Sequence, residues 1–292
     1  MQTFVQLLLS GLSLGCIYGL VALGFVIIYK ATETINFAQG ELMMLGAFLG
    51  WALIDVLKLP FVIGVLLSVV LMAAFGMLIE RVLLRPVIGQ PAFSVVMLTF
   101  GIGYMARGGI NMIPGVGTET HMLTLPYRGI VIRAGEAIMP AEQLVVIGTT
   151  LVLTLGLYCL FRFTRIGVAM QAASQNQLAA FYMGIPVKRI NMLAWGLAAG
   201  IATIGGLLLA PFTFVHANMG FIGLKAFPAA VIGGFGSLPG AIVGGLSIGV
   251  VESLSGFYLP EGFKDIAAYV MVLIVLAVRP QGLLGGNTKK KV

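Results

Sequence analysis

Residues Thr3–Tyr29 read TFVQLLLSGLSLGCIYGLVALGFVIIY, an apolar run that no Asp, Glu, Lys or Arg interrupts. A helix needs about 20 apolar residues to cross the hydrocarbon core of a bilayer, so this run is long enough to cross it with some tilt. A cleaved secretory signal is the alternative, but such a signal has a basic segment before an apolar core of about 7–15 residues. No Lys or Arg precedes Thr3. We therefore expect a retained transmembrane helix.

The composition of the whole chain indicates the same class of protein. Of its 292 residues, 59% are hydrophobic and 9% are charged, and the mean hydropathy is +1.06. Soluble domains carry about 25% charged residues, so a water-soluble fold is excluded, and the apolar content excludes disorder. The two cysteines, Cys16 and Cys159, lie in apolar stretches, which excludes a disulfide framework. We expect an all-α, polytopic inner-membrane protein with a single transmembrane domain over residues 1–292.

Six further apolar stretches approach the length of a membrane span. They are Leu42–Leu57, Phe61–Ile79, Ala92–Ile113, Gln143–Phe161, Ile190–Pro211 and Ile266–Val278. Between the last two, Ala226–Leu254 is rich in Gly and is interrupted by Gly236-Ser237-Leu238-Pro239-Gly240. Gly and Pro both interrupt helices, so this segment is predicted to break there and to cross the membrane twice. A single kinked helix is the alternative, so the sequence predicts eight to nine passes, with nine favoured.

The charged residues indicate which ends of these helices face the cytoplasm. The basic residues in the turns are Lys30, Arg81, Arg85, Arg162, Arg165, Lys188, Arg189, Arg279 and Lys289–Lys291. They alternate with turns that contain Asp55, Glu119, Glu136, Glu142, Glu261 and Asp265. The positive-inside rule then places Arg162–Arg189 and Lys289–Lys291 in the cytoplasm, and Met1 and Thr118–Pro140 outside. This orientation explains the net charge of +7, and no nucleic-acid partner is expected.

The residues needed for ATP hydrolysis or metal binding are missing from this sequence. A P-loop requires Lys directly after Gly, and no Lys in this chain follows a Gly. The two histidines, His121 and His216, are far apart and show no metal-ligand spacing. We expect no catalytic residue, no metal site and no cofactor on this chain.

Few ionisable residues fall inside the predicted spans. A charged side chain costs about 2.5–3.5 kcal/mol at the centre of a membrane helix, so such residues tend to mark a functional site. Arg107 and Glu252 lie near the ends of their spans, and we expect both side chains to reach the membrane surface. Glu41, at the start of the second span, is the one candidate for a functional carboxylate. A proton- or ion-driven carrier usually places carboxylates deep in the membrane, which argues against a self-sufficient secondary transporter.

The polar break before the second span, Lys30–Glu41, is predicted to lie on the cytoplasmic side. Asn36 is a favourable N-cap residue, and Gln39 lies three residues later, at the spacing of a capping box. A capped helix start therefore accounts for both residues without a role in transport. It does not account for Glu41 at the edge of the membrane.

The loop Arg162–Arg189 is the longest cytoplasmic segment. Its centre, Val168–Met183, consists largely of helix formers, and Gly184 followed by Pro186 predicts the end of one helix. The helix is rich in Ala and Gln rather than in Lys, so it fits a groove in a partner protein better than a membrane surface. Its small residues Ala169, Ala172, Ala173 and Ala179 are expected on exposed turns.

Several motifs occur in order along the chain and together resemble those of one family. They are Asn36–Glu41 with Met44–Ala47, Glu80-Arg81, Arg85-Pro86, Arg165–Ala169, Met183–Ile185, Lys225–Phe227, Gly233–Ala241 and Arg279–Gly285. The pattern resembles the permease subunits of branched-chain amino acid importers, which are ATP-binding cassette systems, and is most similar to the shorter of their two paired permeases. The resemblance implies import of a branched-chain or similar hydrophobic amino acid across the bacterial inner membrane.

The resemblance also implies partners and site residues. The partners are a second homologous permease, two cytoplasmic ATPase subunits that bind ATP and Mg²⁺, and a periplasmic substrate-binding protein. The coupling helix that docks on the ATPase is expected to include Arg165, Gly167, Ala169, Ala172, Ala173, Ala179 and Gly184. The translocation path is expected to include Asn36, Phe37, Gln39, Glu41, Gly236, Ser237, Pro239 and Gly240. The family often has His in place of Gln39, so this chain lacks a titratable group there. A stand-alone secondary carrier or channel for a small polar solute is the alternative.

Overall fold

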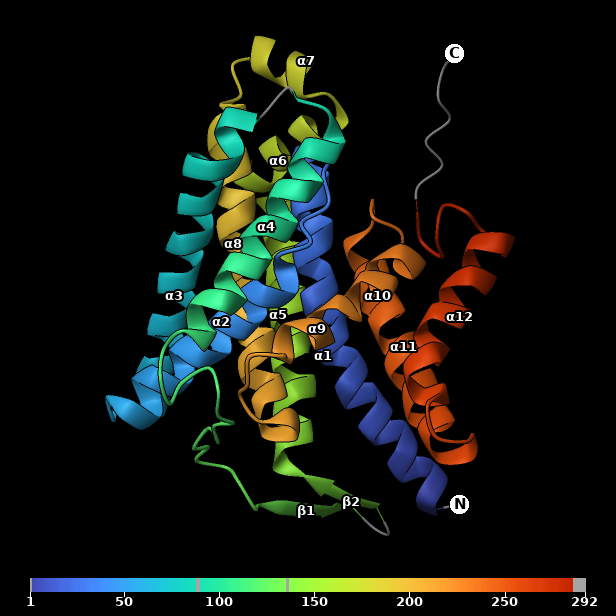
Figure 1. Ribbon diagram of the computed structural model, residues 1–292. Coiled ribbons are helices and arrows are strands. Elements are labelled where there is room, and N and C mark those ends of the chain that lie inside the picture. Colours follow the sequence, from blue (N-terminus) through green and yellow to red (C-terminus); the bar gives the residue numbers. More distant parts are fainter. Residues whose placement is uncertain (1, 88–89, 135–136, 286–292) are drawn as a thin grey trace.

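The computed structural model describes residues 2–87, 90–134 and 137–285. Its helices form an elongated bundle in which the start of the first helix lies at one end and residues 165–182 lie at the other (Figure 1). A small β hairpin, residues 131–140, lies at the same end as the start of the first helix. The loop predicted to be cytoplasmic is thus at the opposite end from the hairpin. Met1 and Lys289–Lys291, to which the charge pattern assigns sides, lie outside the described residues.

Most of the described residues are helical. The α-helices are α1 (Gln2–Thr32), α2 (Gln39–Trp51), α3 (Phe61–Ile79), α4 (Ala92–Asn111), α5 (Ala141–Phe163), α6 (Arg165–Gln175), α7 (Gln177–Tyr182), α8 (Val187–Thr213), α9 (Met219–Leu224), α10 (Ala226–Gly233), α11 (Leu238–Tyr258) and α12 (Phe263–Val278). The π-helical segments η1 (Ala52–Val56) and η2 (Glu80–Leu84) continue α2 and α3, and η2 leads into the 3-10 turn η3 (Arg85–Val87). Strands β1 (Val131–Ala134) and β2 (Ala137–Pro140) pair antiparallel, an addition that the all-α prediction did not include.

Six helices in the described ranges are long and apolar enough to cross a membrane. They are Thr3–Thr32, Phe61–Val87, Phe93–Asn111, Ala141–Phe163, Val187–Thr213 and Leu238–Tyr258. The sequence-based prediction of a helical, polytopic membrane protein is confirmed to this extent. Helix α2 with η1, and helix α12, are the two shorter stretches that the sequence also predicts as spans. Helix α10 has 8 residues and is too short to cross a bilayer alone.

Helix α1 forms the centre of the bundle. It packs against α5, α8, α10 and α11, and its residues Ile17–Ile28 are almost completely buried. Its glycines Gly11, Gly15 and Gly19 face α11. A Cβ atom on Gly15 would lie 2.7 Å from the Cα atom of Leu246, so only glycine permits this approach. Small residues hold membrane helices together in this way, because hydrophobicity does not favour helix association within lipid.

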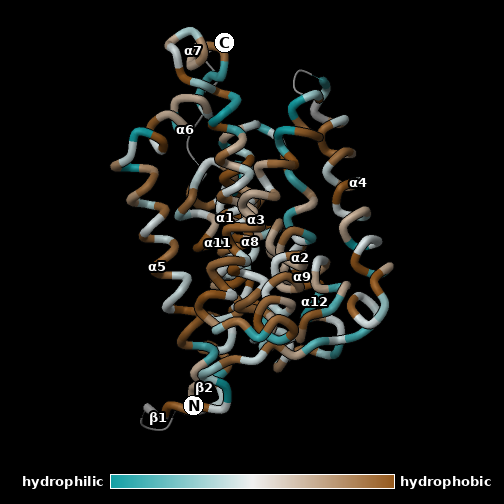
Figure 2. Tube along the Cα trace, turned by 90° about the vertical axis from the view of Figure 1, so that its left-hand side faces the viewer, coloured by the Kyte–Doolittle hydropathy of each residue, from teal (hydrophilic) through white to brown (hydrophobic). Residues whose placement is uncertain are grey.

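The outer helices expose apolar side chains to the surroundings of the bundle. Figure 2 shows that α4 and α5, at the two sides of the bundle in that view, are largely hydrophobic in sequence. Helices α3, α4 and α5 also have many exposed large hydrophobic side chains. Val70 on α3, Val152 on α5 and Leu273 on α12 are between 62% and 69% exposed. Such a surface is unfavourable in water and favourable in lipid, so a bilayer or a second membrane subunit is the environment that covers it.

Candidate functional site

The first break in the helical bundle separates α1 from α2 and contains the predicted path residues Asn36 and Phe37. The side-chain amide of Gln39, at the start of α2, donates a hydrogen bond to the carbonyl oxygen of Ala198 at 3.1 Å. Ala198 lies near the middle of α8, and Gln39 is completely buried. Helix α2 therefore begins inside the bundle (Figure 1), so the later part of the predicted break, from Asn36 to Glu41, lies deeper than predicted. The first part lies at the α7 end as predicted, because the side chain of Gln177 donates a hydrogen bond to the carbonyl oxygen of Ala31 at 2.9 Å.

Asn36 stabilises the break, but not as the predicted N-cap. Ala38 occupies the N-cap position of α2 and makes no side-chain hydrogen bond. The Oδ1 atom of Asn36 instead accepts a hydrogen bond from the backbone N–H of Ala38 at 3.0 Å, and its amide nitrogen donates to Gln39 Oε1 at 3.2 Å. The capping-box interpretation is therefore wrong. The buried side chain of Asn36 therefore satisfies a backbone N–H of this turn inside the bundle, where water is not available as a hydrogen-bond partner.

Phe37 joins the break to two further helices. Its ring stacks on Phe100 of α4, with ring centroids 4.5 Å apart and an interplanar angle of 12°. It also contacts Phe227 of α10 at a centroid distance of 5.4 Å. The backbone N–H of Phe37 donates to the hydroxyl of Thr99 at 3.2 Å. Movement of α4 or α10 would therefore displace the side chain of Phe37 and so change the conformation of this break.

Glu41 and Arg107 form an ion pair between α2 and α4. Each side chain is only 11% exposed, and the guanidinium of Arg107 lies over the ring of Phe221, 3.6 Å from its centroid. The expectation that Arg107 reaches the membrane surface is wrong, because the carboxylate and the aromatic face hold its charge inside the bundle. The Oε2 atom of Glu41 and the Nε atom of Arg107 are buried without a hydrogen-bond partner in the described part of the chain.

Helix α9 packs closely against the start of α2 because both helices have glycine at the contact. A Cβ atom on Gly40 would lie 2.2 Å from the carbonyl oxygen of Gly220, and one on Gly223 would lie 2.5 Å from the Cα atom of Gly40. A Cβ atom on Gly220 would overlap the carboxylate of Glu41. The two short helices therefore contact each other backbone to backbone, and the carboxylate fills the space that glycine leaves.

The second break separates α10 from α11 and is shorter than predicted. Helix α10 ends at Gly233, Gly234 has φ +92°, and α11 begins at Leu238. Ser237 is the N-cap, and its hydroxyl accepts a hydrogen bond from the backbone N–H of Gly240 at 3.1 Å. Pro239 and Gly240, which the sequence places in the break, belong to the first turn of α11. Proline is tolerated there because a first-turn N–H has no partner within the helix.

The chain after α12 closes the second break. The backbone N–H of Leu283 donates to the carbonyl of Ile232 at 2.7 Å, and that of Leu284 donates to the carbonyl of Gly233 at 3.2 Å. These carbonyls lie in the last turn of α10, where a helix leaves acceptors unsatisfied. Two residues of the motif Arg279–Gly285 thus donate backbone hydrogen bonds to carbonyl groups at the end of α10.

The two sets of predicted path residues lie apart. A cavity of about 850 Å³ is lined by Gly236, Ser237 and Pro239 of the second break, together with Lys30 and Arg162 near the α6 end of the bundle. Asn36, Phe37, Gln39 and Glu41 do not line it. The structure therefore brings the first four residues together at depth and places the second break near one end.

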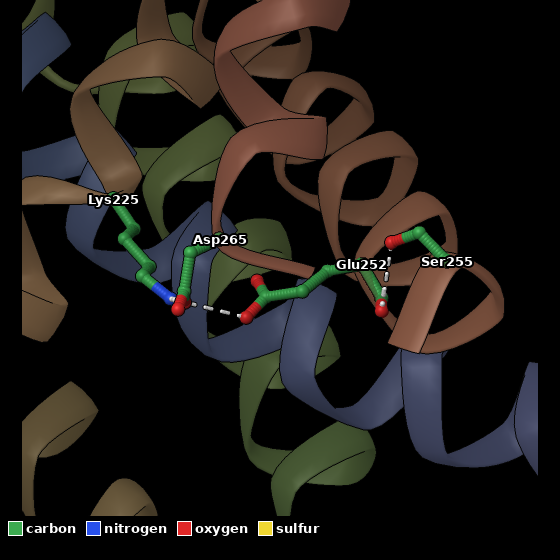
Figure 3. Close-up of polar contacts among 4 residues, drawn as sticks. All are labelled: Lys225, Glu252, Ser255 and Asp265. Carbon is green, nitrogen blue, oxygen red and sulfur yellow. Dashed lines mark hydrogen bonds and ion pairs between the residues drawn. The ribbon is translucent and has the colours of Figure 1, made fainter. Parts of the chain in front are cut away.

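A second cluster of charges joins α10, α11 and α12 at the ends of α10 and α11 that lie away from the second break. Lys225, between α9 and α10, donates to Asp265 of α12 at 2.6 Å and to Glu252 of α11 at 3.3 Å (Figure 3). The side chain of Glu252 is 2% exposed, so the expectation that it reaches the membrane surface is wrong. Asp265 is largely exposed, so the lysine joins one buried and one accessible carboxylate.

The predicted coupling segment consists of two helices. Thr164 caps α6 by accepting from Gly167 N–H at 3.0 Å, and Asn176 ends α6 and caps α7 by accepting from Ala179 N–H at 2.9 Å. A single helix over this segment is therefore a wrong prediction, because Asn176 adopts an extended conformation between the two. Gly184 has φ +81° and ends α7, as predicted.

The exposed surface of the coupling segment differs from the predicted one. Ala173 is buried, Ala169 and Ala172 are half-buried, and Ala179 and Arg165 are exposed. Gly167 is buried against the end of α5. The most exposed large side chains are Leu178, Phe181, Tyr182 and Met183, between 63% and 83% exposed. The sequence-based prediction omits these four residues because small side chains were expected on a docking helix, although the Phe181-Tyr182-Met183 run beside the helix-ending Gly184 is the signal that indicates them.

The family of this protein is decided by a match over nearly the whole chain. Residues 7–276 match the family described as "Branched-chain amino acid transport system / permease component". This chain belongs to that permease family. The resemblance carried by the motifs is thereby confirmed.

Individual members of the family match this permease from end to end. It is 31% identical to the high-affinity branched-chain amino acid transport system permease protein LivH of Salmonella typhimurium over 302 residues, which cover 99% of this chain and 98% of LivH. It is 30% identical to the corresponding permease protein BraD of Pseudomonas aeruginosa over 304 residues, with the same coverage. A probable LivH of Methanocaldococcus jannaschii is 27% identical over 93% of this chain and 89% of its own.

The described residues of this permease contain no group of three His, Cys, Asp or Glu side chains that would hold a metal ion. Its buried carboxylates Glu41, Glu80 and Glu252 form ion pairs with Arg107, Arg85 and Lys225.

Proposed function

We propose that this chain is the transmembrane permease subunit of an ATP-binding cassette importer that carries branched-chain or similar hydrophobic amino acids into the cytoplasm. Its family and the names of its relatives support this assignment. The observation that carries it is the break at Asn36–Glu41, which lies inside the bundle and packs against the glycines of α9. Irregular backbone at membrane depth is tolerated only where it is buried in protein or lines a cavity, and transporters build their paths from such breaks.

The proposed topology has nine passes in one domain of the bacterial inner membrane. Helices α1, α2 with η1, α3, α4, α5, α8, α11 and α12 each cross once, and α9 with α10 makes the remaining pass as a broken helix. The start of α1 lies outside, and α6 with α7 lies in the cytoplasm, in agreement with the basic residues of the segment Arg162–Arg189. The path runs from the first break, with Asn36 to Glu41, to the cavity beside Gly236–Gly240.

The proposed partners are a second homologous permease, two cytoplasmic ATPase subunits and a periplasmic substrate-binding protein. ATP and Mg²⁺ bind to the ATPase subunits, and this chain carries no cofactor. Helix α7 and the residue after it supply the docking surface. The exposed side chains of Leu178, Phe181, Tyr182 and Met183 form an apolar projection that fits a groove in a partner. The remaining residues of the coupling segment, Arg165 to Gly184, hold these four side chains in position.

Reconstitution in liposomes tests the proposal. Uptake of radiolabelled leucine is measured with the complete complex and ATP, with the complete complex and a non-hydrolysable ATP analogue, and with this chain alone. We expect uptake only in the first case. Uptake by the chain alone at a comparable rate would instead support the alternative, a stand-alone secondary carrier or channel.

Labelling of single cysteines tests the topology separately. In a variant without Cys16 and Cys159, Met183→Cys and Met122→Cys place accessible thiols at the two ends of the bundle. A membrane-impermeant maleimide should label position 122 but not position 183 in cells whose outer membrane is permeabilised. Labelling of position 183 under those conditions would contradict the proposed orientation.

A further inference from the structure

A cavity of about 560 Å³ lies at the α7 end of the bundle, beside the junction of α6 and α7. Its walls come from residues 32–34, from η2, from the start of α4, from residues 175–178 of the coupling segment and from the early turns of α8. We call this space the junction cavity. It shares no lining residue with the cavity beside Gly236–Gly240. Its volume is in the range of small-molecule sites, which is about 300–1,000 Å³.

Two buried residues that line the junction cavity have an unused hydrogen-bond acceptor. They are Glu80 of η2, whose side chain is 2% exposed, and Asn191 of α8, which is 3% exposed. The Oε1 atom of Glu80 and the Oδ1 atom of Asn191 have no partner in the described part of the chain. Unpaired buried acceptors are unfavourable, so two of them at one cavity indicate a ligand that donates hydrogen bonds. Glu80 also begins a π-helical turn, a distortion that is frequent at functional sites.

The charges around the junction cavity favour a zwitterion over a simple cation. No Lys or Arg of the described residues lines it, and the other carboxylate oxygen of Glu80 is bound by Arg85 at 2.9 Å. The charge of Glu80 is thus already balanced, and a simple cation would leave an excess positive charge. A zwitterion brings an ammonium group for the free acceptors and its own carboxylate, to which amide N–H groups donate. The amide side chains that line the cavity are Gln90, Gln175, Asn176, Gln177 and Asn191.

The rest of the wall suits an aliphatic side chain. Trp195 lies one helical turn after Asn191, and it lines the cavity together with Leu84 and Val95. An aliphatic group that packs on these side chains leaves water, which favours binding. The cavity therefore combines the polar and apolar surfaces that a branched-chain amino acid needs.

We infer that the junction cavity binds an amino acid from the cytoplasm, and that Glu80 and Asn191 accept hydrogen bonds from its ammonium group. This inference rests on the proposed function and deepens it, because the imported amino acid is the ligand that accumulates on this side. The site is separate from the proposed path, so it senses cargo that has already been released.

Occupancy of this site opposes movement of the coupling segment. Gln177 lines the cavity, and its side chain donates to the carbonyl oxygen of Ala31 at 2.9 Å. A ligand held between α8 and residues 175–178 stabilises the arrangement in which they are close together. The bound amino acid therefore slows the transport cycle, and import falls as its product accumulates.

Proteoliposomes with ATP in the lumen and binding protein outside test the inference, because the lumen then corresponds to the cytoplasm. The initial rate of uptake of radiolabelled leucine is measured at rising luminal concentrations of leucine or of 4-methylpentanoate, the analogue without an amino group. Saturating luminal leucine should lower the rate about fivefold. The analogue offers no ammonium group and should leave the rate within about 1.5-fold of its starting value.

Two variants test the assigned residues. Glu80→Gln removes the negative charge, and Asn191→Leu removes an acceptor without changing the pair of Glu80 with Arg85. Each should raise the luminal leucine concentration that halves the rate about tenfold, because a hydrogen bond to a charged group is lost. Each variant is compared with its own rate in a leucine-free lumen, so a general loss of stability does not imitate the effect.

The matched control is Glu252→Gln. The side chain of Glu252 is also 2% exposed and paired, and it has one unpartnered oxygen, but it does not line the junction cavity. Its half-inhibitory concentration should stay within about twofold of wild type.

Three results would overturn the inference while the proposed function stands. They are uptake that luminal leucine does not change, equal half-inhibitory concentrations in wild type and both cavity variants, and inhibition by 4-methylpentanoate as strong as that by leucine. Absence of ATP-dependent uptake by wild type with a leucine-free lumen would instead refute the proposed function, and the inference with it.

Discussion

The two helix breaks of this permease satisfy their unpaired backbone groups with different partners. At the first break, buried side chains satisfy the backbone and the charges: Asn36 binds its own turn, Gln39 binds α8, and Glu41 pairs with Arg107. At the second break, the backbone of residues 283–284 and the hydroxyl of Ser237 do so. The first lies at depth, and the second lies near one end of the bundle.

This difference indicates how each break responds to change. A break held by buried side chains has no replacement partners, since water does not reach it, so each loss should cost much. A break near one end, held by backbone and a cap, retains its main hydrogen bonds after most substitutions. Substitutions at the first break should therefore lower the free energy of unfolding in detergent more than substitutions at the second break.

The largest effect is expected for Gly40→Ala at the first break. The new Cβ atom would lie 2.2 Å from the carbonyl oxygen of Gly220, which is backbone and cannot rotate away. Overpacking of this kind should cost about 3 kcal/mol and abolish uptake. Gly101→Ala on α4 is the control, because its Cβ atom would meet nothing within 4 Å, and it should be neutral or stabilise by up to about 1 kcal/mol. Equal effects of the two changes would refute the close contact between α2 and α9.

Asn36→Leu should have the next largest effect. It leaves the N–H of Ala38 and the side-chain oxygen of Gln39 without partners inside the bundle. A buried unsatisfied group costs about 1–3 kcal/mol, so we expect a loss of about 2 kcal/mol. A loss below about 0.5 kcal/mol would mean that water reaches this break, and the contrast in depth would then disappear.

Ser237→Ala probes the cap of the second break and should cost about 1 kcal/mol. Ser237→Gly is the matched variant, because glycine at an N-cap costs only a few tenths of a kcal/mol relative to serine. Both changes remove the same hydroxyl, so a clear difference between them identifies a capping role. If both cost about 2 kcal/mol, the hydroxyl has a buried role similar to that of Asn36.

The smallest effect is expected for Pro239→Ala, which should change stability by no more than about 0.5 kcal/mol. Pro239 lies in the first turn of α11, where proline and alanine are both accommodated. The bend is set by Gly234 at φ +92°, four residues before the first residue of α11. A loss above about 2 kcal/mol would show that the ring of Pro239 itself maintains the break.

Most of the membrane helices were predictable because lipid imposes length and apolar composition on each span. The stretch Thr3–Tyr29 is helical throughout within α1, and the break in Ala226–Leu254 was located to within three residues. Gly184 was predicted to end a helix because a positive φ angle favours glycine, and φ there is +81°. These features depend on local sequence and on the membrane alone.

Other features depended on partners distant in sequence. The partner of Arg107 is 66 residues away, and that of Glu252 is 27 residues away, so rules about helix ends placed Arg107 and Glu252 at the membrane surface. The capping box is not formed at Asn36 because the side-chain oxygen of Gln39 accepts from the side-chain amide of Asn36 instead of its backbone N–H, while the amide nitrogen of Gln39 donates to Ala198. Burial of Ala173 likewise followed from how α6 packs on its neighbours.

The sequence by itself determined the class of the protein, the approximate position of its spans, its family and the breaks that interrupt its helices. These follow from composition, from the length that a bilayer requires and from the intrinsic behaviour of Gly and Pro. Only the tertiary structure decided the depth of each break and the pairing of Glu41 with Arg107. The physical reason is that a buried charge takes whichever opposite charge the packing of helices brings within reach, and that packing is set by contacts along the whole bundle.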